Sequence, residues 1–291
     1  MPELPEVETV KRGLEKLLIG HTFKRVTSDN PKSFPNAPAD VDQFLIGAAV
    51  TAIRRRAKVL MIDLSSDYTL VIHLKMTGQI VYRGEDSFGA GHPNGSLIGT
   101  LPDRSTHVEF WLNNNAKLYF NDQRKFGWVR LIPTVEVPNI DFMKKVGPEP
   151  LDDNFTAKEF VQRLERRKGT TIKAAILDQT VLAGIGNIYA DEGLWGAKIH
   201  PATRVKDVPV AKLKKLFSEL QYVLRLSIEK GGSTDRNYVN AEGNRGSYID
   251  FARVFRQEGM PCQRHPNQLI EKIRVASRGT HICPKCQVFK E

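Results

Sequence analysis

The first nine residues, MPELPEVET, put an unusual nucleophile beside acidic side chains. Removal of Met1, which is common before a proline, would leave Pro2 with a secondary amine as the new terminus. Such an amine attacks a sugar carbon to give an iminium, the proline counterpart of a lysine Schiff base. Glu3 follows directly and can transfer protons. The same residues also fit an ordinary acidic helix start, so this segment alone leaves both interpretations open.

The element that must position this terminus is an amphipathic helix, which we predict from about Pro5 to Gly20. Apolar residues recur at steps of three and four, at Val7, Val10, Leu14, Leu17 and Leu18. Pro5 suits the first helical position, and acidic residues suit the first turn. The positive end of the helix dipole disfavours the cation of a nearby amine, which enlarges its neutral, nucleophilic fraction at pH 7.

The tail carries two pairs of metal-ligating residues, Cys262 with His265 and Cys283 with Cys286, separated by seventeen residues. This spacing matches a zinc ribbon in which His265 takes a place more often held by cysteine. The alternative is that the histidine is a bystander beside a missing fourth ligand. All three cysteines lie in the last thirty residues, which favours a metal over disulfides. We predict one structural Zn²⁺.

A glycine-broken turn, Leu182-Ala183-Gly184-Ile185-Gly186-Asn187-Ile188-Tyr189, precedes a predicted helix. Such a turn presents backbone N–H groups to an anion such as phosphate. A tight turn between two helices has the same pattern, so the turn by itself is weak evidence for a site.

Composition bounds the possible partners. The 291 residues are 41% hydrophobic and 26% charged, which is typical of a folded protein large enough for two domains. The net charge of +10 favours a polyanionic partner, although charge also serves solubility. Residues 251–291 contain eight Lys or Arg and three Glu, so half of the net charge lies with the predicted zinc site and indicates nucleic acid. We expect a soluble cytoplasmic protein with no membrane contact, because no apolar run approaches a membrane span.

The chain changes character near residues 146–150. Residues 22–134 favour antiparallel strands: Val50–Leu64 and Tyr68–Met76 flank one turn, and His107–Leu112 and Leu118–Phe120 flank another. Residues 84–106, with five Gly and two Pro, are predicted to be a long mobile loop. Helical periodicity follows at about 156–168, 172–179, 187–196 and 209–230.

We predict an α+β multidomain protein. Its parts are an N-terminal β-rich catalytic domain (1–134), a linker (135–153), a helical domain (154–250) and a zinc finger (251–291). Strand periodicity places Met76 on the same side as Ile72 and Leu74, which predicts a core residue, and Phe126 also fits a core position.

Six motifs together resemble bacterial formamidopyrimidine-DNA glycosylase. They are the opening Pro-Glu-Leu-Pro-Glu-Val-Glu-Thr, Arg56-Ala57-Lys58, His73-Leu74-Lys75-Met76, Arg124-Lys125-Phe126-Gly127, Gly184 to Tyr189, and the cysteine-rich tail. The resemblance runs in order from Pro2 to Gln287. The related endonuclease VIII branch typically opens Pro-Glu-Gly-Pro-Glu, so Leu4 favours the purine-lesion branch.

The resemblance implies an N-terminal β-sandwich with a flanking helix, a helix-two-turns-helix domain and a zinc finger, with duplex DNA bound in the cleft between them. It implies a monomeric base excision repair enzyme, both DNA glycosylase and abasic-site lyase, acting on double-stranded DNA that contains oxidised purines or abasic sites. Pro2 would attack C1′ of a flipped nucleotide such as 8-oxoguanine, and Glu3 would protonate the sugar ring oxygen. The strand would then be cut by β,δ-elimination. DNA binding would associate the protein with the bacterial nucleoid.

The resemblance also assigns roles to residues outside the terminus. Lys58 joins the catalytic group, Glu6 lines the base pocket, and Met76, Arg124 and Phe126 fill the space that the flipped nucleotide leaves. Lys58, Asn187 and Arg278 grip phosphates. The full set of implied DNA contacts is His73, Met76, Arg124, Phe126, Lys173, Asn187, Tyr189 and Arg278. Gly243-Asn244-Arg245-Gly246-Ser247-Tyr248 falls where the family has its base-recognition loop.

The sequence departs from the family pattern at His265, at Lys75, where many members have Gly, and at Gln123, where some have Pro. None of these departures removes catalytic chemistry. Two other functions stay open. One is a lesion-binding protein that does not cut DNA, which would result if Met1 were retained, and the other is a glycosylase for oxidised pyrimidines.

Overall fold

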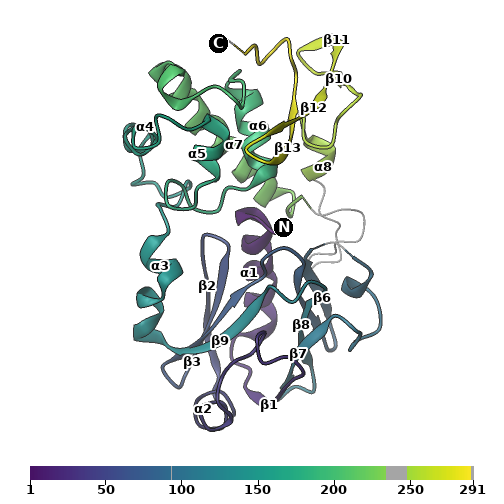
Figure 1. The fold of residues 1–291 in the computed structure, drawn as a ribbon. Coiled ribbons are helices and arrows are strands. Elements are labelled where there is room, and N and C mark those ends of the chain that lie inside the picture. The colour runs from purple at the N-terminus through teal and green to yellow at the C-terminus, as the bar shows by residue number, and fades with distance from the viewer. Residues whose placement is uncertain (93, 234–247, 290–291) are drawn as a thin grey trace. The chain divides into compact units, whose positions relative to one another are not determined.

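The computed structural model describes residues 1–92, 94–233 and 248–289, and the chain divides into two compact units (Figure 1). Unit 1 comprises Met1–Lys144 and Lys230–Ser247, and unit 2 comprises Lys145–Glu229 and Tyr248–Glu291. The zinc-finger residues therefore share a unit with the helices that follow residue 145. Among the described residues no helix is both long enough and apolar enough to span a membrane.

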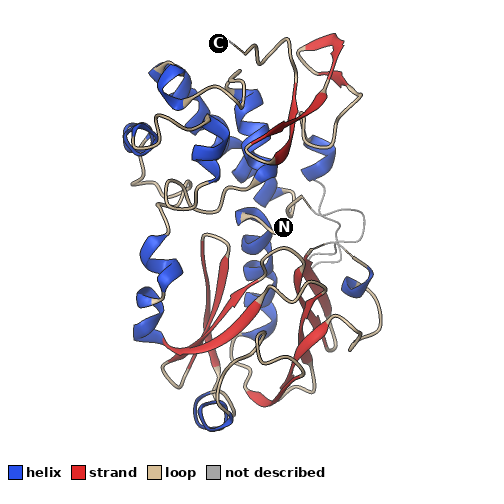
Figure 2. Cartoon of the chain, in the orientation of Figure 1, coloured by secondary structure: helices blue, strands red, loops and turns tan. Residues whose placement is uncertain are grey.

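Unit 1 is built from two antiparallel sheets (Figure 2). The five-stranded sheet has the order β1 (Phe23–Ser28), β7 (Thr106–Leu112), β8 (Lys117–Asp122), β5 (Gly78–Arg83) and β6 (Ser87–Gly91). The four-stranded sheet has the order β2 (Val50–Arg56), β3 (Val59–Leu64), β4 (Tyr68–His73) and β9 (Trp128–Pro133). Short helices α2 (Pro38–Phe44), η1 (Gly95–Leu97), η2 (Thr134–Asn139) and α3 (Asp141–Lys145) lie in the connections.

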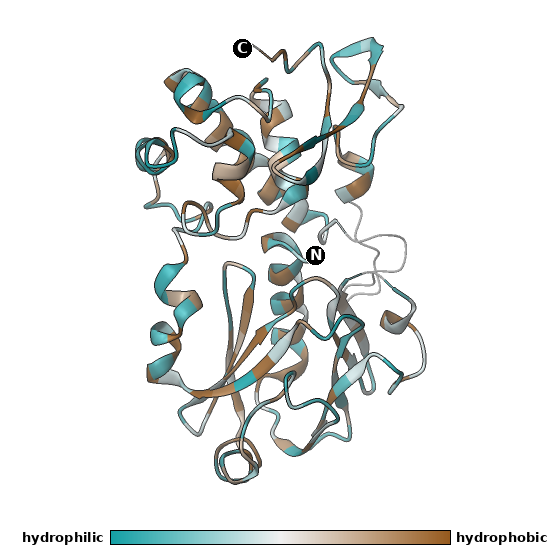
Figure 3. Ribbon diagram, in the orientation of Figure 1, coloured by the Kyte–Doolittle hydropathy of each residue, from teal (hydrophilic) through white to brown (hydrophobic). Residues whose placement is uncertain are grey.

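Helix α1 (Leu4–Leu18) packs against strands of both sheets, and its apolar face joins theirs in one core. Val7, Val10 and Leu14 are fully buried, as the predicted periodicity requires. Hydrophobic and hydrophilic residues alternate around the helix in Figure 3. Gly13 allows a close approach to β6, since a Cβ there would lie 2.4 Å from the Phe88 ring. The core thus fixes the helix that carries the N-terminal residues.

Three details of unit 1 differ from the predictions. Residues 84–106 are not one long loop, because Ser87–Gly91 forms the edge strand β6 and its Phe88 packs in the core. Val50–Leu64 is a hairpin rather than a single strand, because Ala57 has a φ of 52° and turns the chain. Strand β4 ends at His73, before Met76. Met76 therefore does not follow the alternation of the strand, and its side chain is 40% exposed.

Unit 2 centres on α6 (Asn187–Gly196), whose residues from Tyr189 to Gly196 are all buried. Around it lie α4 (Ala157–Glu165), α5 (Ile172–Leu177), η3 (Val205–Asp207), α7 (Val210–Glu229) and α8 (Tyr248–Phe251). The predicted helices are present, although α4 ends at Glu165 rather than near residue 168, and α5 ends at Leu177 rather than near residue 179.

Two hairpins complete unit 2. One joins β10 (Pro261–Cys262) to β11 (His265–Leu269), and the other joins β12 (Glu271–Val275) to β13 (Arg278–Ile282). The three cysteines share a small core with Trp195 of α6. The Arg264 guanidinium lies 3.7 Å from the centre of the Trp195 ring and donates to the backbone oxygen of Trp195. These contacts attach the hairpins to the helices.

Candidate active site

The residues predicted to carry the chemistry lie at the N-terminal end of α1. Pro2 is buried, and Glu3, the residue before the first helical turn, is only 2% exposed. The Glu6 carboxylate accepts the backbone N–H of Glu3 at 2.8 Å, one half of a capping box. This bond fixes the backbone beside Pro2, so an amine at residue 2 would stand at the positive end of the helix dipole.

The other oxygen of Glu6 holds a distant segment of unit 1. Its Oε1 accepts both the backbone N–H and the hydroxyl of Ser233, each at 2.8 Å. Glu6 therefore ties the helix start to residue 233 with both carboxylate oxygens. Of the predicted base-recognition stretch, residues 243–247 lie outside the described part of the chain, and Tyr248 is buried against Tyr189.

Lys58 lies in the turn between β2 and β3 and is 6% exposed. Arg55 links this turn to α1, because its guanidinium donates to Glu8 at 2.9 Å and to the backbone oxygen of Ala57 at 3.1 Å. Burial opposes the charge of Glu8, yet the hydrogen bond and charge of Arg55 hold the Glu8 pKa below its usual value. The core and this ion pair together fix the turn that carries Lys58 relative to α1.

His73 ends β4 opposite Val59, the residue after Lys58. Burial, reinforced by the charges of Lys75 and Lys58, lowers the pKa of His73 to about 3. Its Nδ1 accepts the backbone N–H of Lys75 at 3.0 Å, so the neutral ring carries its proton on Nε2. His73 is therefore a neutral hydrogen-bond donor at pH 7 and not a cation.

The three predicted space-filling side chains lie together on neighbouring turns of unit 1. Met76 and Phe126 are 40% and 53% exposed, which contradicts the core positions that periodicity alone predicted. An Arg124 Nη1 lies 3.0 Å from the Met76 sulfur, and the guanidinium lies 4.7 Å from the centre of the Phe126 ring. An apolar wedge, a multiple hydrogen-bond donor and an aromatic ring thus project from one small area.

A cavity of about 780 Å³ adjoins these side chains. It is lined by Asn30, Lys32, Lys75, Arg124, Lys125, Phe126 and Gly127. Four of these described residues are cations and none is acidic, which suits a polyanion. Sequence reasoning missed Lys32 as a candidate. The only available signal was its place in a turn rich in Asn, Asp and Pro, which is common on protein surfaces.

The glycine-broken turn of unit 2 leads into α6 as predicted, with Gly186 as the residue before the helix. Gln179 braces this turn: its side chain accepts the Gly184 N–H at 3.0 Å and donates to the Ile185 oxygen at 2.7 Å. Asn187 donates its side-chain amide to the backbone oxygen of Gly279 at 3.0 Å, next to Arg278. The sequence did not single out Gln179, because a polar residue after a helix is common.

Two predicted DNA contacts are instead interior residues. The Lys173 side chain is fully buried, and its ammonium contacts an Asp191 oxygen and the Thr280 hydroxyl, each at 2.6 Å. Tyr189 is fully buried, with its hydroxyl 2.6 Å from that of Ser227. Their burial has a structural explanation: a cation without water needs a buried partner, and an aromatic ring on this face of α6 belongs to the core. Contact between these two residues and DNA stays a prediction.

Arg278 is held indirectly by that interior. It is the first residue of β13 and is exposed, after a turn in which Ala276 and Ser277 have positive φ. Two residues along the same strand, Thr280 meets the buried Lys173, and the His281 N–H donates to Asp191 at 2.9 Å. The buried ion pair therefore fixes the strand that presents Arg278.

The four predicted metal ligands converge, with their donor atoms all within 4.8 Å of one another. The Cys262 and Cys286 sulfurs are 3.7 Å apart, and His265 Nδ1 lies 3.2 Å from the Cys286 sulfur and 3.9 Å from that of Cys283. Tetrahedral zinc with Zn–S bonds of about 2.3 Å requires sulfurs about 3.8 Å apart. The donor set thus fits one structural zinc, with His265 as the fourth ligand.

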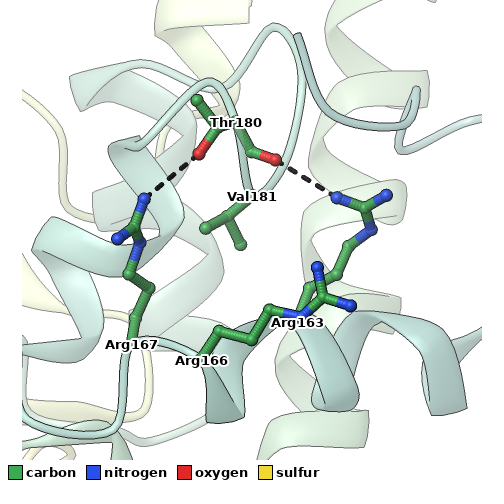
Figure 4. A pocket seen from close by; sticks show the side chains of 5 residues that line it. All are labelled: Arg163, Arg166, Arg167, Thr180 and Val181. Carbon is green, nitrogen blue, oxygen red and sulfur yellow. Dashed lines mark hydrogen bonds between the residues drawn. The ribbon is translucent and has the colours of Figure 1, made fainter. Parts of the chain in front are cut away.

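A second cationic hollow, of about 260 Å³, lies in unit 2 at the end of α4. Figure 4 shows Arg163, Arg166 and Arg167 around it, with Thr180 and Val181. Arg163 donates to the Thr180 oxygen at 3.2 Å, and Arg167 donates to its hydroxyl at 3.3 Å and pairs with Asp178 at 2.7 Å. These two arginines brace the loop that Gln179 also holds.

Three family models match the chain. They are the formamidopyrimidine-DNA glycosylase N-terminal domain over residues 1–129, the formamidopyrimidine-DNA glycosylase H2TH domain over 146–238, and the zinc finger found in FPG and IleRS over 268–288. The chain is 42% identical to the formamidopyrimidine-DNA glycosylase of Herpetosiphon aurantiacus, in an alignment that covers 99% of this chain and 100% of that one.

Two solved structures extend the likeness to the fold. One is the complex between the Lactococcus lactis Fpg and an abasic site containing DNA, with a TM-score of 0.87 and 33% identity. The other is MutM in complex with carbocyclic 8-oxo-G containing DNA, with a TM-score of 0.85 and 33% identity. Each comparison covers 99% of this chain and 100% of the other.

Proposed function

We infer the reaction of this chain from one premise: it belongs to the formamidopyrimidine-DNA glycosylase family, as matches along nearly its whole length show. The chain is a DNA glycosylase of base excision repair that acts on oxidised purines in DNA, and its family is bifunctional, with abasic-site lyase activity. The predictions of fold class, enzyme class and DNA partner are thereby confirmed. The roles of individual residues are our proposal.

We propose that Pro2, once Met1 is removed, is the nucleophile. Its amine nitrogen bonds to C1′ of the damaged nucleotide and gives up its proton, and the bond from C1′ to the base breaks, so that the base leaves with the electron pair and a proton. Opening of the sugar breaks the bond between C1′ and O4′ and leaves an iminium between the proline nitrogen and C1′. The observation that carries this proposal is the burial of Pro2 and Glu3 at the capped start of α1.

Glu3 supplies the proton that the ring oxygen needs when the sugar opens. The iminium then withdraws electrons from C2′, so that loss of a C2′ proton expels the 3′ phosphate, and a second elimination expels the 5′ phosphate. Lys58, a cation that is only 6% exposed, supports this step by attracting the phosphate of the flipped nucleotide. Glu6 lines the base pocket, and its carboxylate accepts the backbone N–H groups of Glu3 and Ser233.

The remaining proposed roles belong to DNA binding. Met76, Arg124 and Phe126 enter the duplex where the nucleotide has left, and Arg124 donates to the orphaned cytosine. His73 donates to a phosphate through Nε2, while Asn187 and Arg278 grip phosphates from unit 2. One structural zinc, held by Cys262, His265, Cys283 and Cys286, would fix the hairpins and supply no chemistry. We propose that the monomer works on the bacterial nucleoid.

Borohydride trapping tests the nucleophile. Reduction during turnover on a duplex containing 8-oxoguanine opposite cytosine should freeze a covalent adduct, and peptide mapping should place it on Pro2. A matched variant that retains one residue ahead of Pro2 has an amide there, which is not nucleophilic. It should form no adduct yet bind an abasic-site analogue within about twofold. An adduct on Lys58 would refute the proline assignment, and the absence of any adduct from protein whose mass lacks Met1 would favour a lesion-binding protein that does not cut.

A further inference from the structure

Two turns of unit 1 carry the proposed space-filling residues, and they meet at a single buried carboxylate. The 74–78 turn presents Met76, and the 122–127 turn presents Arg124 and Phe126. Asp122, the last residue of β8, is fully buried between them and pairs with Gly78 in the sheet. Asp122 lies outside the six motifs that carry the family resemblance.

The Asp122 side chain accepts hydrogen bonds from both turns. Oδ2 accepts the backbone N–H groups of Phe126 at 2.8 Å and Gly127 at 2.6 Å. Oδ1 accepts the N–H of Arg124 at 3.2 Å and the hydroxyl of Thr77. The Thr77 oxygen in turn accepts the Arg124 N–H at 3.1 Å. One carboxylate therefore fixes the backbone of Arg124 and Phe126 in the second turn and binds Thr77, the residue next to Met76.

Asp122 is itself held rigidly through its backbone. Its N–H donates to the Ser105 oxygen at 2.7 Å, and its oxygen accepts from His107 Nε2 at 3.0 Å. The other ring nitrogen of His107 lies 2.8 Å from an Asp29 oxygen. Gly127 leaves room for the arrangement, because a Cβ there would lie 2.8 Å from the Phe120 ring and 3.1 Å from Asp122 Oδ2. The carboxylate is thus a fixed point rather than a mobile side chain.

A side chain at the start of a turn often caps the next few N–H groups, so the bonds within the 122–127 turn have an ordinary local explanation. The bond to Thr77 does not. Thr77 is 45 residues away in sequence and 8% exposed, and its hydroxyl joins the two turns. Arg124 adds two further links between the turns, from its N–H to the Thr77 oxygen and from its guanidinium to the exposed Met76 sulfur.

We propose that Asp122 and Thr77 are positioning residues that lock the two turns into one unit, so that Met76, Arg124 and Phe126 enter the duplex in a single fixed arrangement. This inference rests on the proposed function of those three residues. Preorganisation matters because Arg124 must meet the hydrogen-bonding edge of the opposite base, and a small displacement of a donor weakens its bond. The Asp122–Thr77 pair therefore sets the discrimination between cytosine and adenine opposite the lesion.

Thr77→Val tests the proposal with nearly unchanged side-chain shape. It removes the cross-turn hydroxyl and leaves the bonds from Asp122 to Phe126 and Gly127 in place. We expect the ratio of 8-oxoguanine excision opposite C to excision opposite A to fall by about tenfold. Cutting of a pre-formed abasic site should stay within about twofold, because Pro2 and Glu3 are untouched. Thr77→Ser restores the hydroxyl and should restore the ratio.

Thr69→Val is the matched control. Thr69 is fully buried in unit 1 and donates its hydroxyl to the Asp63 carboxylate at 2.8 Å, outside both turns. It should lower stability as Thr77→Val does, without changing the opposite-base ratio. Asp122→Asn places an amide donor against the N–H groups of Phe126 and Gly127, and should lower the ratio at least as far as Thr77→Val.

Arg124→Ala, measured in the same assay, separates the proposed role of Arg124 at the opposite base from the positioning role of Asp122 and Thr77. If Arg124→Ala lowers the ratio while folded Thr77→Val and Asp122→Asn keep that of the wild type, the positioning role is refuted and the role of Arg124 stands. If Arg124→Ala leaves the ratio unchanged, the proposed role of Arg124 fails and the positioning inference fails with it. Equal changes in Thr69→Val and Thr77→Val would show a loss of stability only, which also refutes the inference.

Discussion

The two units hold their proposed DNA-facing side chains on buried carboxylates, but the partners of those carboxylates differ. In unit 1 Asp122 accepts hydrogen bonds from neutral groups, namely the N–H groups of Phe126 and Gly127 and the hydroxyl of Thr77. In unit 2 Asp191 faces the buried ammonium of Lys173 at 2.6 Å. Both carboxylates are fully buried, so the contrast lies in their partners rather than in exposure.

This difference predicts which property each unit loses when a partner of its buried carboxylate is removed. Loss of one neutral donor beside Asp122 leaves other donors in place and shifts a turn, so the consequence should appear in recognition more than in folding. Loss of a buried cation leaves its carboxylate uncompensated, which is costly to the fold itself. Substitutions in unit 1 should therefore alter chemistry and discrimination, and substitutions in unit 2 should alter stability and affinity.

Removal of zinc should produce the largest effect, and it tests whether unit 2 depends on its buried groups for stability. Cys283→Ala should lose the metal and unfold the hairpins that carry Arg278, because the binding free energy of a structural zinc, on the order of 10 kcal/mol, is also folding free energy. Unit 1 should stay folded. Metal analysis, duplex affinity and hydrogen exchange resolved by segment measure the three consequences.

Lys285→Ala is the control for the metal site, since Lys285 is exposed between the last two cysteines and ligates nothing. It should retain one zinc per chain. His265→Ala tests the fourth ligand separately. Full zinc affinity in His265→Ala would contradict the histidine assignment, and undenatured wild-type protein without zinc would contradict the site.

Glu3→Gln should lower base excision by about 10²- to 10⁴-fold, because the amide cannot protonate the ring oxygen. Cleavage of a pre-formed abasic site should survive at least in part, since the Pro2 amine remains. Single-turnover rates on the two substrates measure the separation. The control is Glu8→Gln in the same helix, which loses the ion pair with Arg55 and no proposed chemistry. Equal losses on both substrates would assign Glu3 to structural support.

Lys173→Met tests the buried pair directly. The substitution keeps side-chain length and leaves Asp191 as an unpaired buried charge, so we expect a loss of about 3–5 kcal/mol in the free energy of unfolding of unit 2. Denaturant unfolding gives this value. Adding Asp191→Leu should recover part of the loss, because no charge is then stranded. Undiminished stability with lost DNA affinity would instead support direct contact between Lys173 and DNA.

The parts predicted well from sequence were those that depend on local pattern. Periodicity located α1 and α7, and ligand spacing located the zinc site to the residue, since chelation requires short separations within each pair. The strand β6 was missed because its Gly-rich sequence becomes a strand only when Phe88 packs over Gly13. That contact joins residues 75 positions apart, and no local pattern records it.

Residue roles were harder to predict than elements, for the same physical reason. Lys173 resembles a surface cation in sequence, and only the fold brings Asp191 and Thr280 to its ammonium. Met76 fits the strand alternation, and only the end of β4 at His73 turns it outward. No local pattern in the sequence marks Asp122, because its importance arises from donors that converge on it from two separate turns.

His73 gives a smaller, pH-dependent effect within unit 1. Its pKa is about 3 in the folded chain and near 6.5 when unfolded. Between these values the unfolded chain binds a proton that the folded chain does not, so the free energy of unfolding falls by about 1.4 kcal/mol per unit as pH drops below 6.5. His73→Gln should flatten the acid limb of the stability curve between pH 6.5 and 4. His21→Gln, at a half-buried histidine of the same unit, is the control, and equal flattening in both would contradict the assignment.

Arg278→Ala should give the smallest effect and sharpens the comparison, because it removes an exposed cation and leaves the buried pair that positions it. If Arg278 grips one phosphate, duplex affinity should fall modestly for every sequence, and the slope of log affinity against log salt should flatten by about one unit. Arg166→Ala removes another exposed arginine of unit 2, at the rim of the hollow in Figure 4 and outside the proposed grip. It should leave the slope unchanged, because salt screens an exposed charge that contacts no phosphate, whereas a contacted phosphate releases its counterion. An equal change in both variants would mean that unit 2 attracts DNA through its overall charge and that the strand held by Lys173 and Asp191 presents no specific contact.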